Sequence, residues 1–297
     1  MTFLMNAELA RAQSGLDDVF IVLVHPTTCQ SDSSYFGAEE RRWRVSNILL
    51  PMLAFFPRVS GFRQADSSAE AVGLHHEAEH VFPPPGMLGQ MNIASMSQEL
   101  VAGLVRKPPV AFPRADGAAV TLARQWLKMH VPSGLLPIVI TLRDAGYSQI
   151  RNSNLETWAG FAQSLDRDKF CPVFVPDTQT AFQGPPKVLE DFPWFSSAAF
   201  HLGLRFAVYE LAYLNLLTSN GPSALCYYSP DIRYLFFKII VEDAPESTKR
   251  HLAAYGYDIG KNLPFAGPFQ KWVWEDDDPG VVWREFEAMV ASIERSC

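Results

Sequence analysis

In the C-terminal half of the chain, short runs of apolar residues alternate with longer stretches whose apolar positions recur at helical spacing. The apolar runs are typical of buried strands in a parallel sheet, and they cover residues 136–142, 172–176, 214–219 and 234–241. The helical patterns cover residues 154–165, 196–213, a short stretch from Pro222, and 279–293. The last of these helices has a suitable N-cap in Asp278, and it follows a short apolar segment at 272–274. This order predicts an α/β domain.

The N-terminal half is less regular. Residues 19–24 form a continuous apolar run that predicts a buried parallel strand followed by a loop. A helix is predicted over residues 38–55, bent or shortened at Pro51. Between residues 60 and 118 only 93–105 looks helical, because proline clusters interrupt the periodicity, and the pattern predicts no order of strands there.

The clearest break in the chain follows a helix predicted over 117–130. There Pro132, Ser133 and Gly134 stop the helix, and a new buried strand begins directly afterwards. We therefore expect two α/β domains, residues 1–134 and residues 135–297.

Composition and charge narrow the class of protein. The chain has 297 residues, of which 48% are hydrophobic and 19% charged, so it is far too apolar to be disordered. Its formal net charge is −7, and it has no run of lysine or arginine, which argues against nucleic acid as a ligand. No segment approaches the roughly 18 apolar residues of a transmembrane helix, and the first residues do not resemble a secretion signal. The expectation is a cytoplasmic protein without a transmembrane segment.

The sequence predicts no structural metal and no disulfide framework. Its cysteines are widely scattered, at Cys29, Cys171, Cys226 and Cys297. A histidine cluster, formed by His75, His76 and His80 with Glu77, has helix-like spacing, yet we interpret it as a solvated loop rather than a metal site. Similarly, Arg205 and Glu210 in the apolar helix over 196–213 are interpreted as a buried structural pair in preference to catalytic groups.

Polar residues follow three of the predicted strands, at the points where a parallel sheet binds ligands. After the strand at 136–142 come Arg143 and then Arg151, Asn152 and Ser153, directly before a helix. Two arginines beside a helix N-terminus suit a diphosphate, since a guanidinium matches phosphate oxygens and keeps its charge. The structural alternative is that Arg143 pairs with an acidic neighbour, Asp144 or Glu156, and that Asn152 or Ser153 merely caps the helix.

The other two strand ends offer further ligand candidates. Asp177 follows the strand at 172–176, and the turn formed by Asn220, Gly221 and Ser223 follows the strand at 214–219. Glycine in such a turn lets backbone amides approach a ligand. Taken alone, the turn could equally be an ordinary connection between a strand and a helix. We favour the interpretation as a binding site over that as an ordinary turn, because the ends of three strands are expected to converge on one crevice.

Three segments of the C-terminal half carry a family resemblance: VITLRDAGYSQIRNSNLETW at 139–158, PVFVPD at 172–177 and LLTSNGP at 216–222. Their order resembles the donor half of GT-B glycosyltransferases, and more narrowly it is similar to bacterial heptosyltransferase-like and fucosyltransferase-like proteins. The resemblance covers about residues 135–290. Two departures stand out: heptosyltransferases usually carry an acidic residue where Asn220 stands, and the fucosyltransferase arginine signature is absent.

The resemblance implies two Rossmann-like lobes with a ligand cleft between them, the N-terminal domain facing the acceptor and the C-terminal domain binding a nucleotide-sugar donor. By position, the donor diphosphate would meet Arg143 and the turn at Asn220, Gly221 and Ser223. It further implies metal-independent sugar transfer, with no cofactor beyond the nucleotide sugar as co-substrate. The acceptor is unknown.

Sugar transfer also needs a base for the acceptor hydroxyl. In the N-terminal domain we expect this base among His25, Glu39 and Glu40, with Asp32 as a further carboxylate nearby. Two other functions fit the same features: a noncatalytic nucleotide-sugar-binding or scaffold protein, and a nucleotide-sugar epimerase or hydrolase on the same architecture.

Overall fold

A computed structural model describes residues 1–23, 37–84 and 92–296. The chain forms two compact units, one made of Met1–Phe112 with Ala254–Gly256, the other of Pro113–Ala253 with Tyr257–Cys297. The division at residue 112 precedes the break expected near residue 134. Helix α6 (Gly117–His130) accounts for the difference, because it packs against α9 (Leu202–Leu211) of the C-terminal unit.

The N-terminal unit contains a two-stranded sheet in which β1 (Val19–Leu23) and β2 (Val59–Gln64) pair in parallel. Helix α1 (Thr2–Ser14) packs against α5 (Ile93–Val105). The other helical segments are α2 (Ala38–Arg44), η2 (Val45–Leu49), α3 (Leu50–Leu53) and α4 (Ser68–Glu77).

Several N-terminal elements depart from the sequence expectation. The strand at 19–24 is parallel as predicted, but it is not buried, since only Ile21 is inside and Phe20 is 58% exposed. The helix predicted over 38–55 exists, with η2 forming a π-helical segment directly before the turn that contains Pro51. Strand β2 and helix α4 were not predicted, because their apolar residues follow neither a strand period nor a helix period clearly.

The C-terminal unit is built on a five-stranded sheet in the order β4-β3-β5-β6-β7, and every neighbouring pair is parallel. Its strands are β3 (Leu136–Thr141), β4 (Phe170–Val175), β5 (Leu214–Thr218), β6 (Tyr234–Phe237) and β7 (Gln270–Trp272). A parallel bridge between Phe174 and Trp194 adds one more extended segment beside β4. When the segment at Trp194 is counted as the third extended segment along the chain, between β4 and β5, the order across the sheet is 3-2-1-4-5-6. This is the strand order of a doubly wound Rossmann sheet.

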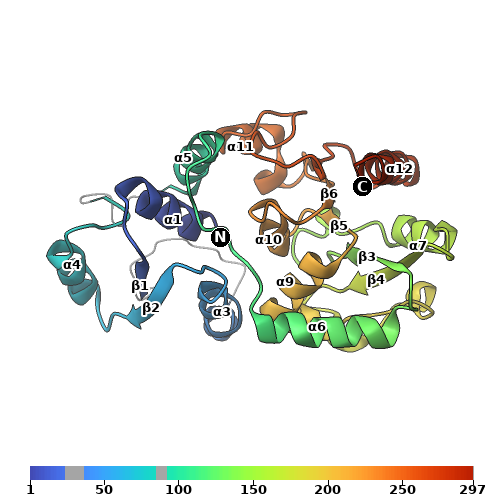
Figure 1. The fold of residues 1–297 in the computed structure, drawn as a ribbon, viewed down its shortest axis with the longest axis horizontal. Helices are drawn as coiled ribbons and strands as arrows, with labels where there is room; N and C mark the ends of the chain where they lie inside the picture. Colours follow the sequence, from blue (N-terminus) through green and yellow to red (C-terminus); the bar gives the residue numbers. More distant parts are fainter. Residues whose placement is uncertain (24–36, 85–91, 297) are drawn as a thin grey trace. The chain divides into compact units, whose positions relative to one another are not determined.

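Side chains on β3 alternate between two helical layers, as successive residues of a strand point to opposite faces. Ile138 and Ile140 belong to an apolar core with α7 (Leu155–Ser164) and α12 (Pro279–Glu294). On the other face, the Thr141 hydroxyl lies 2.9 Å from the hydroxyl of Tyr209 in α9. Figure 1 shows α7 and α12 apart from α6 and α9 within this unit.

The remaining C-terminal elements refine the prediction. The helix predicted over 196–213 is divided at His201 into α8 (Ser197–Phe200) and α9, because the ring nitrogen of His201 caps α9 by accepting from the Leu204 amide at 3.1 Å. The strand predicted to reach residue 241 ends at Phe237, because Lys238 has a φ of 53°. A short helix follows each of two strands: α10 (Ala224–Tyr227) comes after β5, and α11 (Lys249–Ala254) comes after β6. Within the three described stretches, no helix is long and apolar enough to cross a membrane.

Candidate functional site

The carboxyl ends of β3 and β5 lie side by side at the topological switch point of the C-terminal sheet. From β3 the chain crosses toward β4 on one side, whereas from β5 it continues toward β6 on the other. Connections that diverge in this way leave an opening at the strand ends, where open α/β sheets bind their ligands. The residues that follow β3 and β5 are therefore the best candidates for ligand contacts in this unit.

The segment that follows β3 is held in one conformation by its own side chains. Ser153 Oγ accepts a hydrogen bond from the Arg143 amide at 2.8 Å, and the Ser153 amide donates to the Arg143 carbonyl at 2.9 Å. Asn152 pairs with both the amide and the carbonyl of Ala145, each at 3.1 Å. Asp177, from the end of β4, accepts from the Asp144 amide at 3.3 Å. In the structure Asn152, Ser153 and Asp177 thus shape the loop that carries the two arginines.

Arg143 is buried but incompletely satisfied. Its exposed fraction is 4%, Nη2 donates to the Tyr147 carbonyl at 3.0 Å, and its guanidinium lies 5.0 Å from the centre of the Tyr147 ring. The Nε hydrogen has no partner in the described part of the chain, and none of the carboxylates described there pairs with Arg143. The structural alternative, in which Arg143 pairs with Asp144 or Glu156, is therefore not what the structure shows. A buried, unpaired guanidinium is costly, so this position favours an anionic ligand.

Arg151 lies close to Arg143 and is tied to β5 and to a later loop. Its Nη1 forms an ion pair with Glu246 at 2.9 Å, and Nη2 donates to Ser219 Oγ at 3.0 Å. The Nε atom is again buried without a partner among the described residues. Burial lowers the pKa of Arg151, and the charge of Arg143 lowers that pKa further. The like charge of Arg143 thus disfavours the charged form of Arg151, and a bound anion would relieve this repulsion.

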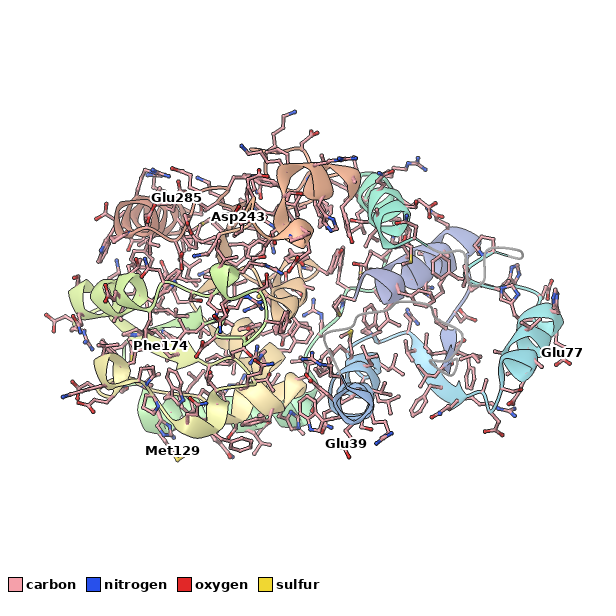
Figure 2. All side chains as sticks on the ribbon, turned by 180° about the vertical axis from the view of Figure 1, so that it is seen from behind. Glu39, Glu77, Met129, Phe174, Asp243 and Glu285 are labelled. Carbon is pink, nitrogen blue, oxygen red and sulfur yellow. The ribbon has the colours of Figure 1, made fainter. Side chains whose placement is uncertain are left out.

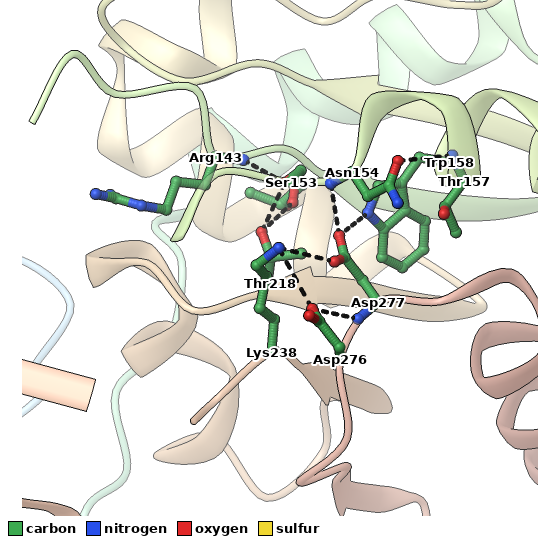
Figure 3. A network of polar contacts seen from close by, with 10 residues as sticks. Arg143, Ser153, Asn154, Thr157, Trp158, Thr218, Lys238, Asp276 and Asp277 are labelled. Carbon is green, nitrogen blue, oxygen red and sulfur yellow. Dashed lines mark hydrogen bonds and ion pairs between the residues drawn. The ribbon is translucent and has the colours of Figure 1, made fainter. Parts of the chain in front are cut away.

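The N-terminus of α7 does not have the role that the sequence suggests. Its N-cap is Asn154 rather than Asn152 or Ser153, with Oδ1 accepting from the Thr157 amide at 3.3 Å. The Asn154 amide donates to Asp277 at 2.7 Å, as Figure 3 shows. A carboxylate of the protein itself thus occupies the helix end where we expected a phosphate group.

Asp277 belongs to a buried network that the sequence did not reveal. It is 1% exposed, accepts from the Trp158 indole at 2.9 Å and pairs with Lys238 at 3.2 Å. Lys238 also pairs with Asp276 at 3.3 Å. Figure 3 shows this network next to the hydrogen bonds that Ser153 forms with Arg143 and Thr218. The one signal in the sequence was Lys238, a lysine inside the apolar run that predicts a strand over 234–241.

The turn after β5 is capped internally. Asn220 Oδ1 accepts from the Ser223 amide at 3.1 Å and from the Ser223 hydroxyl at 2.8 Å. Ser223 is fully buried, and its hydroxyl oxygen also lies 3.1 Å from the Thr218 carbonyl oxygen, so its side chain faces inward and not toward a ligand. A side chain added at Gly221 would meet nothing within 4 Å, which leaves the backbone of this residue open to approach.

A cavity of about 140 Å³ lies beside Arg143 within the C-terminal unit. Its walls include Asp144, Asp177, Gln183 and Trp194, and the indole nitrogen of Trp194 is buried without a partner in the described residues. The volume is below the roughly 300 Å³ of typical small-molecule sites. This cavity can therefore enclose only part of a nucleotide-sized ligand.

The candidate bases belong to the N-terminal unit. Glu39 is exposed at the start of α2, where Figure 2 labels it. Glu40 forms an ion pair with Arg44 at 2.8 Å, four residues further along the helix. His25 and Asp32 lie outside the described residues. Glu39 is thus the candidate carboxylate that forms no ion pair with the side chains that the structure describes.

The histidine cluster and the charged residues Arg205 and Glu210 have structural roles. His75 lies in α4 instead of a solvated loop, with Nε2 2.9 Å from the Pro83 carbonyl, and no group of three or more His, Cys, Asp or Glu side chains in the described residues could hold a metal ion. Arg205 and Glu210 do not pair with each other. Arg205 donates to the carbonyls of Ala198 and Pro176, and Glu210 accepts from the Ala115 amide.

Comparison with known proteins identifies similar folds but no similar sequence. No protein-family model and no curated protein matches the chain. A glycosyl transferase family 9 protein from Veillonella parvula DSM 2008 superimposes with a TM-score of 0.55 at 10% identity, covering 96% of this chain and 85% of that one. ADP-heptose LPS heptosyltransferase II from E. coli gives a TM-score of 0.51 at 7% identity, covering 99% of this chain and 96% of that one. The protein therefore has the GT-B-like fold of two Rossmann-like lobes, as the resemblance implied.

Proposed function

We propose that the protein transfers a sugar from a nucleotide-sugar donor to an acceptor without using a metal ion, and that the donor diphosphate binds at the carboxyl edge of the C-terminal sheet. The fold supports this proposal, since both similar structures are described as glycosyltransferases. Fold alone does not specify chemistry. The main support is therefore the site itself.

The observation that carries the proposal is the pair of buried arginines at the switch point. Arg143 and Arg151 each hold an Nε hydrogen without a partner among the described residues, and of the two only Arg151 forms an ion pair there, with Glu246. Charge-assisted hydrogen bonds from the guanidinium groups to phosphate oxygens would compensate the charge of Arg143, which forms no ion pair among the described residues. A neutral ligand would leave that charge uncompensated.

The proposed reaction follows from that arrangement. The oxygen of the acceptor hydroxyl forms a bond to the anomeric carbon while the bond from that carbon to the diphosphate breaks. The hydroxyl proton passes to a base, for which Glu39 is the candidate described in the N-terminal unit. The nucleoside diphosphate leaves with its electron pair, and the arginines stabilise the growing negative charge without a metal. The same pocket without a base would give a noncatalytic binding protein.

Binding is tested first by thermal shift with nucleoside diphosphates and nucleotide sugars. A ligand present at 100 times its Kd should stabilise the folded state by about 2.7 kcal/mol. Calorimetric titration with the best ligand then compares the wild type with Arg143→Ala and Arg151→Ala. Each loss should cost about 1.5–3 kcal/mol of binding free energy, as expected when a hydrogen bond to a charged group is removed.

Arg124→Ala is the matched control, because Arg124 is exposed on α6 of the same unit. Unchanged binding by both site variants, with circular dichroism showing intact folding, would place the phosphate site elsewhere. Turnover is tested separately, by following the release of nucleoside diphosphate from a bound nucleotide sugar in the presence of acceptor extracts. Binding without any release would favour the noncatalytic alternative.

A further inference from the structure

Arg143 is held in place by Tyr147, a residue of the same loop. Its Nη2 donates to the Tyr147 carbonyl at 3.0 Å, and the carbon of its guanidinium lies 5.0 Å from the centre of the phenol ring. One contact comes from the backbone of Tyr147 and the other from its side chain. Together they restrict how far the guanidinium can turn, so Arg143 has a defined orientation although no carboxylate among the described residues pairs with it.

The backbone on both sides of Tyr147 is fixed. On one side, the Gly146 amide donates to Gln179 Oε1 at 2.6 Å. On the other side, Ser148 has a φ of 50°, in the left-handed region that residues other than glycine adopt infrequently. The Tyr147 side chain itself is half-buried. The conformation of the loop therefore keeps Tyr147 beside Arg143.

The contacts with Tyr147 leave one part of the guanidinium for a ligand. Nη2 donates to the Tyr147 carbonyl and Nε is buried, whereas Nη1 of Arg143 forms no hydrogen bond with the described residues. An aromatic ring contacts the flat face of a guanidinium, while an anion accepts hydrogen bonds from the N–H groups in its plane. The ring of Tyr147 and a phosphate oxygen can therefore contact Arg143 at the same time.

From these contacts we infer that Tyr147 is a positioning residue for the proposed phosphate site: its ring holds Arg143 in the orientation in which Nη1 donates to a phosphate oxygen of the donor. The inference rests on the proposed function, because it assigns the residue that prepares Arg143 for that phosphate. An arginine that is free to turn loses this freedom when it binds an anion, and the loss weakens binding by about two- to tenfold. Tyr147 makes the loss smaller, because the arginine side chain is already ordered.

The test separates the aromatic face of Tyr147 from its bulk. Tyr147→Phe keeps a ring that can contact the guanidinium, whereas Tyr147→Leu keeps an apolar side chain without such a face, and both variants keep the backbone carbonyl. Calorimetric titrations use ADP, GDP and UDP, and the tightest of the three is then used with every variant. Ile150→Ala is the control for a change in the same loop, since Ile150 is 50% exposed. Circular dichroism confirms that each variant is folded.

In Tyr147→Leu we expect the Kd of the nucleoside diphosphate to rise by about two- to tenfold, as the ordering of one arginine side chain implies. Tyr147→Phe should bind more tightly than Tyr147→Leu, and Ile150→Ala should bind like the wild type. In an Arg143→Ala background, the change from tyrosine to leucine should raise the Kd no further, because the ring acts through Arg143.

A second measurement needs no nucleotide. Phenylglyoxal modifies arginine side chains, and mass spectrometry of the digested protein gives the rate of modification at each position. Arg143 should react faster in Tyr147→Leu than in the wild type or in Tyr147→Phe, because its guanidinium is no longer held against a ring. The rate at the exposed Arg124 should be the same in all three proteins.

Three binding results would overturn the inference: a Tyr147→Leu protein that binds at least as tightly as the wild type, a Tyr147→Phe protein that is weakened as much as Tyr147→Leu, or an equal effect of Tyr147→Leu with and without Arg143. Each leaves the proposed function intact, because the wild type still binds the nucleotide. An unchanged modification rate at Arg143 would likewise show that the ring does not hold it. Failure of the wild type to bind any of the three nucleotides would instead refute the phosphate site, and the inference would be refuted with it.

Discussion

Asp277 and Trp158, 119 residues apart in the sequence, are joined by a buried hydrogen bond in which the indole Nε1 donates to the carboxylate at 2.9 Å. The same carboxylate oxygen accepts from the Asn154 amide at 2.7 Å. The start of α7 is thus attached to the segment after β7, as Figure 3 shows. Because Ser153 and Asn154 end the loop that carries Arg143 and Arg151, this attachment fixes one end of the candidate phosphate site.

Replacing Asp277 should therefore weaken both folding and ligand binding. Asp277→Asn leaves Lys238, whose side chain is 12% exposed, with Asp276 as its remaining ion-pair partner. We expect a loss of about 1–3 kcal/mol in the free energy of unfolding, measured by urea denaturation. Asp276→Asn is the matched control and should cost less, because the Asp276 side chain is 56% exposed. Equal losses in the two variants would contradict this view of the network.

The hydroxyl of Thr218 should contribute to the geometry of the switch point. Thr218 is fully buried on β5, and its Oγ1 lies 2.9 Å from Ser153 Oγ. Thr218→Val keeps the shape of the side chain but removes this hydrogen bond, which should cost about 0.5–1.5 kcal/mol of stability in thermal or urea unfolding. Thr121→Val, at an exposed position of α6, removes a hydroxyl that donates to the Gly117 carbonyl four residues earlier, and it should cost less. A Thr218→Val protein as stable as the wild type would show that the contact is not important.

Arg143→Lys should separate charge from geometry at the candidate site. Lysine keeps the positive charge but lacks the planar fork and the Nε donor of arginine. We expect nucleoside diphosphate binding to weaken by about 1–3 kcal/mol in calorimetric titration, although the net charge is unchanged. Full affinity in the lysine variant would indicate that only the charge matters. The exposed Arg124→Lys serves as the comparison.

Glu285 should make the stability of the C-terminal unit depend on pH. This side chain of α12 pairs with Lys271 of β7 and with Arg284 at 3.0 Å. Burial raises the pKa of Glu285, but the bonds from Lys271 and Arg284 outweigh it and lower the pKa below the ordinary 4.5. A lowered pKa in the folded state means that the stabilisation is present above about pH 4.5 and is lost as the pH falls through the lower, folded value.

Urea unfolding of wild type and Glu285→Gln across the acid range tests this dependence. The variant should be less stable by about 1–3 kcal/mol near neutral pH, and the two curves should converge in acid. Glu287→Gln is the control, since Glu287 is exposed on the same helix. A constant difference at every pH would mean that the ion pairs of Glu285 do not cause the effect.

The order of elements in the C-terminal unit could be read from local patterns. Apolar runs and helical spacing are properties of neighbouring residues, so β3, α7, β4 and β5 were predicted within one or two residues. The position of Arg143 at a strand end followed from the same patterns. In the N-terminal unit, where few apolar side chains are deeply buried on β1 and β2, the periodicity was too weak to predict β2 or α4.

The partners of the polar groups depended on tertiary contacts that no local pattern encodes. Glu246 reaches Arg151 across 95 residues, and Asp277 reaches Asn154 across 123. These pairs meet because parallel strands far apart in the chain end at one edge of the sheet, which is a consequence of strand order. Local signals thus specified which residues stand at the strand ends. Packing of the whole sheet determined that Asp177, Asn152 and Ser153 bind the backbone, while the Nε atoms of Arg143 and Arg151 stay without a partner among the described residues.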